Sequence, residues 1–108
     1  MSDEHLHRAE TVIKTANNIS AEKKVEFVGL LSRLKSAIGD VSQTHAGDAQ
    51  SVARLAEASA REATLKRPNQ LEKTLRELKR SVDKFEASHP DLVITANEFA
   101  TLLAEMGI

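Results

Sequence analysis

The C-terminal stretch from Pro68 to Ile108 carries apolar residues at alternating steps of four and three, in two successive runs. On an α-helix this spacing collects the side chains on one narrow stripe, a pattern typical of helices that pack side by side at shallow angles. The runs are too short for a long coiled coil, so they predict two helices of a small bundle. The stripes are Leu71, Leu75, Leu78, Val82 and Phe85, followed by Leu92, Ala96, Phe99, Leu103 and Met106.

A capping motif separates these two predicted helices. Ser88-His89-Pro90-Asp91 matches the S-x-x-D pattern, in which the Ser88 hydroxyl accepts a hydrogen bond from the Asp91 amide while the Asp91 carboxylate reaches back. We therefore expect the second helix to begin almost directly after the first. In this interpretation Ser88, His89, Pro90 and Asp91 are structural residues.

The last residues of the sequence have the pattern of a helix stop. Gly107 is expected to adopt the left-handed conformation that commonly follows a final helical turn. Ile108 would then contact Leu103 as the apolar partner of a Schellman motif. We expect both Gly107 and Ile108 to be packed against the bundle.

Composition sets the broad class of protein. A length of 108 residues fits a single helical domain, with N-terminal helices in 1–65 and a helix pair, bent at 88–90, in 66–108. Ala, Leu, Glu and Lys dominate, and Pro68 and Pro90 are the two prolines, which favours an all-α bundle of four to five helices. With no cysteine, no signal-like start and no membrane-length apolar run, the sequence predicts a cytoplasmic protein that does not enter a membrane.

Three further helices are expected before Pro68, at 3–17, from about 20 to 39, and at 49–65. Ser2, Ser20 and Asp48 are suitable N-terminal caps for them. The segment from Gly39 to Gly47 is the longest predicted loop, because it combines glycines with polar residues.

The predicted helix at 49–65 has one face made mostly of alanine, which permits a close approach of neighbouring helices. Arg54, Glu57 and Arg61 are assigned to the opposite side. Glu57 precedes Arg61 by four residues, the favourable order for an ion pair along a helix surface. We expect these three residues to face solvent.

Charge is distributed unevenly along the C-terminal part of the sequence. Residues 66–84 contain seven basic and three acidic residues, whereas 85–108 contain four acids and no Lys or Arg. Lys73, Arg76, Arg80 and Lys84 form a basic stripe on the side of their helix away from the leucines. This basic stripe is either a solvated surface or a partner surface that meets acidic residues, on another protein or on another copy of the chain.

Two Glu-x-x-His spacings, Glu4–His7 and Glu86–His89, resemble the motif that di-iron helical bundles use. Glu86 and His89 straddle the predicted cap, and Glu4 and His7 fall in a first turn, so we interpret all four as solvated groups at helix ends. The sequence contains no nucleophile elbow and no glycine-rich phosphate loop. It therefore predicts neither an enzyme nor a cofactor.

The run FEASHPDL at 85–92 and the terminal EMGI resemble the domain of unknown function 4404 family, a group of short bacterial proteins. In that family a helix ends in a Phe-acid-x-Ser-His-Pro run and the chain closes on Met-Gly-Ile. The resemblance is specific over 82–108 and looser over 19–38. Because the family has no assigned activity, cofactor or catalytic residue, the resemblance implies a bacterial origin and no mechanism.

Together these patterns favour a non-enzymatic protein–protein interaction or oligomerisation module. We expect a homodimer, because the thin first helix, the alanine face and a row of small residues at Val25, Gly29, Ser32 and Ser36 offer more contact surface than one small core needs. That row has a second interpretation as an ordinary solvent face. A small regulatory nucleic-acid binder and a metal-binding bundle are the alternatives, and a net charge of −1 with three aromatic residues argues against the former.

Overall fold

The computed structural model of the protein describes residues 2–107, with side chains from residue 3 onward. Within this range the chain forms five α-helices and no strand, which confirms the predicted all-α bundle. The helices are α1 (Ser2–Thr15), α2 (Ala21–Ser42), α3 (Ala46–Thr64), α4 (Pro68–Asp83) and α5 (Pro90–Met106).

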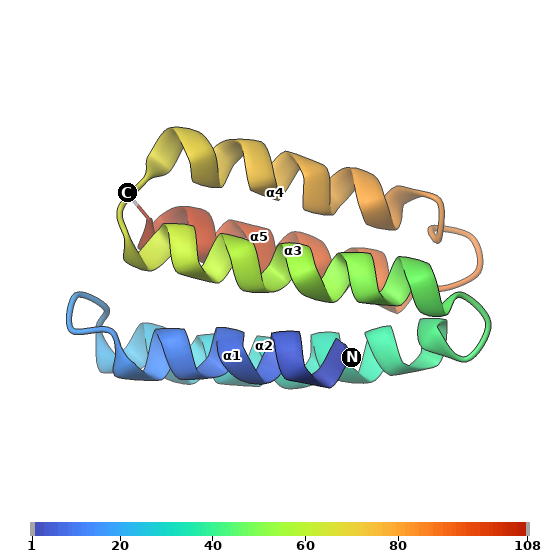
Figure 1. The fold of residues 1–108 in the computed structure, drawn as a ribbon, viewed down its shortest axis with the longest axis horizontal. Coiled ribbons are helices and arrows are strands. Elements are labelled where there is room, and N and C mark those ends of the chain that lie inside the picture. Colours follow the sequence, from blue (N-terminus) through green and yellow to red (C-terminus); the bar gives the residue numbers. More distant parts are fainter. Residues whose placement is uncertain (1, 108) are drawn as a thin grey trace.

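Helix α3 is the centre of the bundle. It contacts each of the other four helices, whereas α1 contacts α2 and α3 but neither α4 nor α5 among the described residues. Figure 1 shows α4 above the α3–α5 pair, and α1 with α2 below it. Short connections make successive helices run in opposite directions, so α1 and α3 run parallel.

The first helix lies on α3 and α2, through the apolar side that the sequence predicted. Leu6, Ala9 and Ile13 are buried there. A thin apolar stripe is sufficient because the alanine-rich face of α3 lets the α1 backbone approach closely. The predicted Ser2 cap lies outside the described side chains.

The second helix begins where the sequence places it, because the Ser20 side chain accepts a hydrogen bond from the Lys23 amide at 3.2 Å. Its end is different. The predicted loop from Gly39 to Gly47 is wrong: α2 continues through Ser42, and three residues separate it from α3. Gly39 weakens a helix by only about 1 kcal/mol, and burial of Ile38 and Val41 on the continued turn offsets that cost.

The third helix starts earlier than expected, with His45 at the N-cap position, so the predicted Asp48 cap is also wrong. Asp48 lies in the first turn, where its carboxylate accepts a hydrogen bond from Lys84 at 2.8 Å. An acid in the first turn suits the positive end of the helix dipole as well as a capping acid would.

Helix α3 ends in a Schellman motif, the kind of helix stop that the sequence predicted at Gly107. Lys66 has a left-handed φ of 54°, and its amide donates to the Ala63 carbonyl. The next amide, of Arg67, donates to the Glu62 carbonyl at 3.2 Å, which completes the motif. Pro68 then starts α4 at its first position, as predicted.

The core confirms the predicted stripes on α4 and α5. Phe27 of α2 and Phe99 of α5 are fully buried with ring centroids 5.3 Å apart. The apolar and alanine positions of α3 are buried between the layers. The buried positions on α3, α4 and α5 include Ala49, Val52, Ala53, Ala56, Ala60, Ala63, Leu71, Leu75, Leu78, Val82, Leu92, Ala96, Leu103 and Met106.

Candidate functional site

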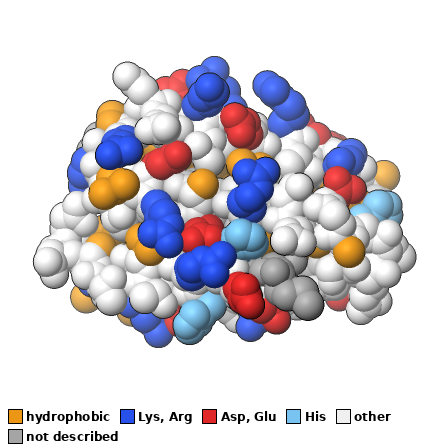
Figure 2. All heavy atoms as spheres, viewed as in Figure 1, with side chains coloured by type: hydrophobic (Ala, Val, Ile, Leu, Met, Phe, Trp, Pro, Cys, Tyr) orange, Lys and Arg blue, Asp and Glu red, His pale blue; other side chains and the backbone are white. Residues whose placement is uncertain are grey.

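The four residues of the basic stripe are all exposed. Lys73, Arg76 and Arg80 lie on α4, and Lys84 follows its last residue. Figure 2 shows Lys and Arg side chains gathered along the top edge of the molecule, over α4. Two of the four already have partners: Lys84 pairs with Asp48 of α3, and Arg76 lies 3.5 Å from the Glu72 carboxylate.

A groove runs between α4 and α5, close to this stripe. Its apolar floor is formed by Leu71 and Leu75 of α4 and by Ala100 and Ala104 of α5, and we call it the α4–α5 groove. Its volume is about 470 Å³. The hollow lies where α5 contributes the small side chains of Ala100 and Ala104 opposite the leucines of α4.

Polar and charged residues form the edges of the α4–α5 groove. Glu72, Arg76 and Lys79 come from α4, while Thr101 and Glu105 come from α5. All five are exposed. An apolar floor with a charged, solvated edge is the usual anatomy of a protein-binding surface.

The turn between α4 and α5 is longer than predicted. Helix α4 ends at Asp83, and six residues precede Pro90. Phe85, expected on the α4 stripe, lies in this turn and is still buried. Its ring holds the turn against the core, so a helix-to-helix connection forms without a direct cap.

The predicted Ser88 cap is wrong. His89 occupies the N-cap position of α5, with φ −138° and ψ 67°, and no side chain caps the helix there. The reason is Pro90, which starts the helix and forces the preceding residue out of the helical region. The Ser88 hydroxyl instead lies 3.0 Å from Nδ1 of His89, and Asp91 sits in the first turn.

His45 and His89 make equivalent arrangements at the same end of the bundle. Each occupies an N-cap position with nearly the same backbone angles, and each has Nδ1 close to the hydroxyl of the preceding residue. Both rings pack edge-on to Phe85, at centroid distances of 5.3 and 5.7 Å. In the Ser-His-Pro motif, His89 therefore packs on Phe85, and Ser88 makes no capping bond to α5.

Gly107 does not adopt the left-handed conformation predicted for it. Its φ is −85°, and its amide continues the helical pattern by donating to the Leu103 carbonyl at 2.9 Å. The space at this position is narrow for a different reason, because a Cβ would overlap the end of the Leu71 side chain and would lie 3.3 Å from the Leu103 carbonyl oxygen. The predicted contact of Ile108 lies outside the described residues.

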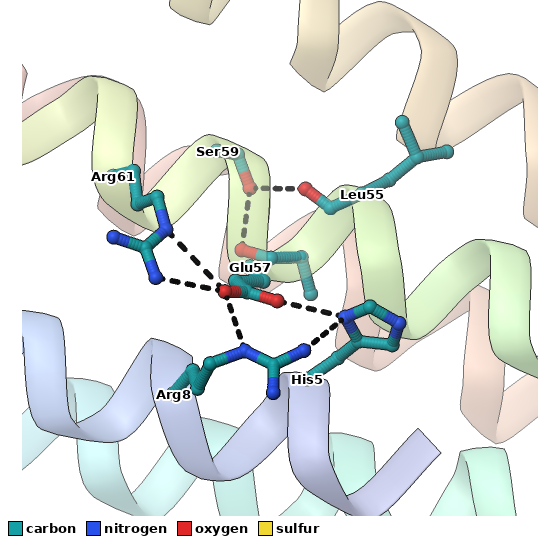
Figure 3. A network of polar contacts seen from close by, with 7 residues as sticks. His5, Arg8, Leu55, Glu57, Ser59 and Arg61 are labelled. Carbon is teal, nitrogen blue, oxygen red and sulfur yellow. Dashed lines mark hydrogen bonds and ion pairs between the residues drawn. The ribbon is translucent and has the colours of Figure 1, made fainter. Parts of the chain in front are cut away.

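Sequence reasoning missed a second polar site, centred on Glu57. This residue was assigned to the solvent face of α3, but it is 9% exposed and lies beneath α1. Its carboxylate accepts hydrogen bonds from Arg8 at 2.9 Å and from Arg61 at 3.0 Å. Figure 3 shows His5 and Arg8 reaching it from α1 while Arg61 reaches it along α3.

The state of the Glu57 site follows from its contacts. Burial raises the pKa of Glu57, but hydrogen bonds from Arg8, His5 and Arg61 lower it by more, so that the pKa falls from 4.5 to about 2. An ionised carboxylate cannot donate, so the 2.7 Å contact with Nδ1 of His5 is a hydrogen bond in the tautomer that carries the proton on Nδ1. The site is a fixed anion held by cations, and it fastens α1 to α3.

A signal for this site was present in the sequence. Glu57 follows Ala53 by four residues and precedes Ala60 by three, so it belongs to the alanine face as much as to the charged one. The pairing with Arg61 was predicted correctly. The partners from α1 could not be foreseen, because they lie 49 and 52 positions away in the chain.

The residues of the two Glu-x-x-His spacings do not form a metal centre. Between residues 2 and 107 there is no group of three or more His, Asp or Glu side chains placed to hold a metal ion. Glu4, His7 and Glu86 are exposed, and His89 packs on Phe85.

None of the helices described between residues 2 and 107 is both long and apolar enough to cross a lipid bilayer. Neither the curated proteins nor the solved structures contain a match to the chain. Residues 28–108 match the model of a protein family described as a domain of unknown function (DUF4404). The matched region includes Glu57 and the α4–α5 groove but begins inside α2, after His5 and Arg8 of α1. Because the match covers most of the sequence and extends to its last residue, the chain belongs to the DUF4404 family.

Proposed function

We propose that this chain is a non-enzymatic protein-interaction module and that the α4–α5 groove is its binding surface. The observation that carries the proposal is the groove itself, an open hollow of about 470 Å³ whose floor is apolar and whose edges carry charge. The apolar floor supplies affinity through burial, while the charges at the edges set the orientation and rate of association.

The position of the groove supports this proposal. Leu71 and Leu75 belong to the buried stripe of α4 and also line the groove, so a partner can contact them without unfolding either helix. The family match also covers both of its walls.

Self-association is a second form of the same proposal. The reasons for expecting a homodimer are weaker in the structure, because α1 and the alanine face of α3 are used against each other. The row at Val25, Gly29, Ser32 and Ser36 is exposed, and a Cβ at Gly29 would meet nothing within 4 Å. Size-exclusion chromatography with light scattering, at several protein concentrations, tests this form. A mass that stays at one chain would exclude a homodimer.

The basic stripe gives less support to nucleic-acid binding than the sequence did. Lys84 and Arg76 have acidic partners in the same chain, so two of the four charges are partly neutralised. At the groove, Arg76 of the basic stripe is joined by Lys79, which the stripe does not include.

Site-specific photo-crosslinking in the source cells tests the proposal. A photoreactive amino acid replaces Thr101 at the groove edge, and a matched control replaces Thr11, which is exposed on α1. We expect a defined adduct from position 101 that is lost when Ala104→Leu fills the groove. Equal adducts from both positions, or none from position 101, would refute the groove as the binding surface.

A further inference from the structure

The floor of the α4–α5 groove is shaped to receive bulky apolar side chains. The α5 side of the groove is shallow, because its residues Ala100, Ala104 and Gly107 have small side chains or none. Leu71 and Leu75 form the α4 side. The lining extends along α4 from Pro68 to Lys79, which is about three helical turns or roughly 16 Å. This length suits two or three apolar anchors spaced one turn apart.

An α-helix fits this groove better than an extended segment. A β-strand peptide needs a sheet edge to pair its backbone N–H and C=O groups, and residues 2–107 form no strand. A polyproline II peptide docks in grooves lined by aromatic residues, and the lining of this groove contains none. A helix satisfies its own backbone groups and can present apolar residues at i, i+3 or i+4, and i+7 to a groove between two helices.

The charge at the groove edge favours an acidic occupant. Glu105 is engaged by Lys23 of α2 at 2.9 Å, and Glu72 lies 3.5 Å from Arg76. Lys79 has no ion-pair partner among the described side chains. Lys73 continues the positive charge on the exposed surface of the same helix.

From these features we infer that the α4–α5 groove binds an amphipathic helix of a partner protein, with apolar residues on one face and Asp or Glu beside them. This inference rests on the proposed function and specifies its partner. The acidic residues of the partner would meet Lys79, while its apolar face fills the hollow above Ala104.

A second copy of the chain suits the groove less well. Glu98 and Glu105, two of the acids on α5, are already paired with Arg33 and Lys23 of α2. Their charge is therefore engaged within the chain, where it stabilises the α2–α5 contact. An external acidic helix carries charge that is not committed in this way.

The experiment is a selection from a display library of random peptides about four helical turns long, with the full-length protein as bait. Peptides that bind the wild type but not Ala104→Leu are sequenced and synthesised. We expect apolar residues at i, i+3 or i+4, and i+7 with Asp or Glu alongside. Circular dichroism checks that Ala104→Leu keeps its helices.

A charge-reversal pair tests the electrostatic part without altering the groove. Lys79→Glu is expected to weaken binding of the selected peptides roughly tenfold, because an attraction is replaced by a repulsion. Lys35→Glu, a matched change on the exposed surface of α2, is expected to leave binding unchanged. Equal losses from both variants would show unspecific attraction and overturn the inference.

The outcomes separate this inference from the proposed function. Groove-dependent peptides that are basic, neutral or without helical spacing would overturn the acidic helix but leave the interaction module in place. A selection that yields no groove-dependent peptide would overturn both.

Discussion

Nδ1 of His5 lies 2.7 Å from a carboxylate oxygen of Glu57, although the two residues are 52 positions apart in the sequence. This contact and the Arg8 bond join α1, which precedes the family match, to α3 at the centre of the bundle. Three donors stabilise the Glu57 carboxylate. Removing these donors would strongly destabilise the folded protein, because an unpaired charge would remain in its interior.

The Glu57 site predicts a specific response to acid. Because its pKa is about 2 in the folded chain and 4.5 ordinarily, the unfolded state takes up the proton first as the pH falls. The stabilisation is complete above the ordinary pKa and is lost between it and the folded value. The shift corresponds to about 3 kcal/mol of unfolding free energy.

Urea unfolding of the wild type and of Glu57→Gln across this pH range measures the effect. We expect the two unfolding free energies to converge as the pH falls from 5 towards the folded pKa of about 2. A constant gap between the two curves would show that folding does not lower the pKa of Glu57.

The two serines that the sequence assigns to caps should respond differently to alanine. Ser20→Ala removes a hydrogen bond to the Lys23 amide and is expected to cost about 1 kcal/mol of stability. Ser88→Ala removes a hydroxyl that caps no helix, so we expect a loss below about 0.5 kcal/mol. Thermal unfolding of both variants measures the two losses of stability. Equal losses would support the predicted Ser88 cap.

Two glycines form another matched pair. Gly29 is exposed within α2 and has open space around its missing Cβ, so Gly29→Ala should stabilise the protein by up to about 1 kcal/mol. At Gly107 a Cβ would overlap Leu71, so Gly107→Ala should destabilise it by roughly 1–3 kcal/mol. Chemical denaturation measures both changes, and a neutral Gly107→Ala would show that the Leu71 side chain moves aside without cost, contrary to this prediction.

Lys66 tests the Schellman motif at the end of α3. Its left-handed φ of 54° is costly for a residue with a Cβ, whereas glycine adopts it freely. Its ammonium group also donates to the Met106 carbonyl, so any substitution loses that bond. The informative comparison is therefore Lys66→Gly against Lys66→Ala. We expect the glycine variant to be more stable by about 1 kcal/mol in urea unfolding, and the reverse order would exclude a left-handed backbone there.

The apolar stripes were predictable because helical periodicity is local. Leu71 to Val82 and Leu92 to Met106 are buried as their spacing requires. Helix ends were less predictable, because each depends on a balance between local preference and tertiary contacts. Gly39 does not end α2, since burial of Val41 outweighs its poor helix propensity. Ser88 does not cap α5, because Pro90 restricts the backbone of the residue before it, so that His89 takes the N-cap position.

The sequence by itself determined the helix content, the apolar faces and the exposed basic stripe, because each depends on residues three or four positions apart. Only the tertiary structure decided that Glu57 is buried, since its partners on α1 are brought to it by the packing of α1 on α3. The α4–α5 groove was decided in the same way. Small side chains on α5 leave a hollow only when Leu71 and Leu75 of another helix stand beside them, and no periodicity within either helix contains that information.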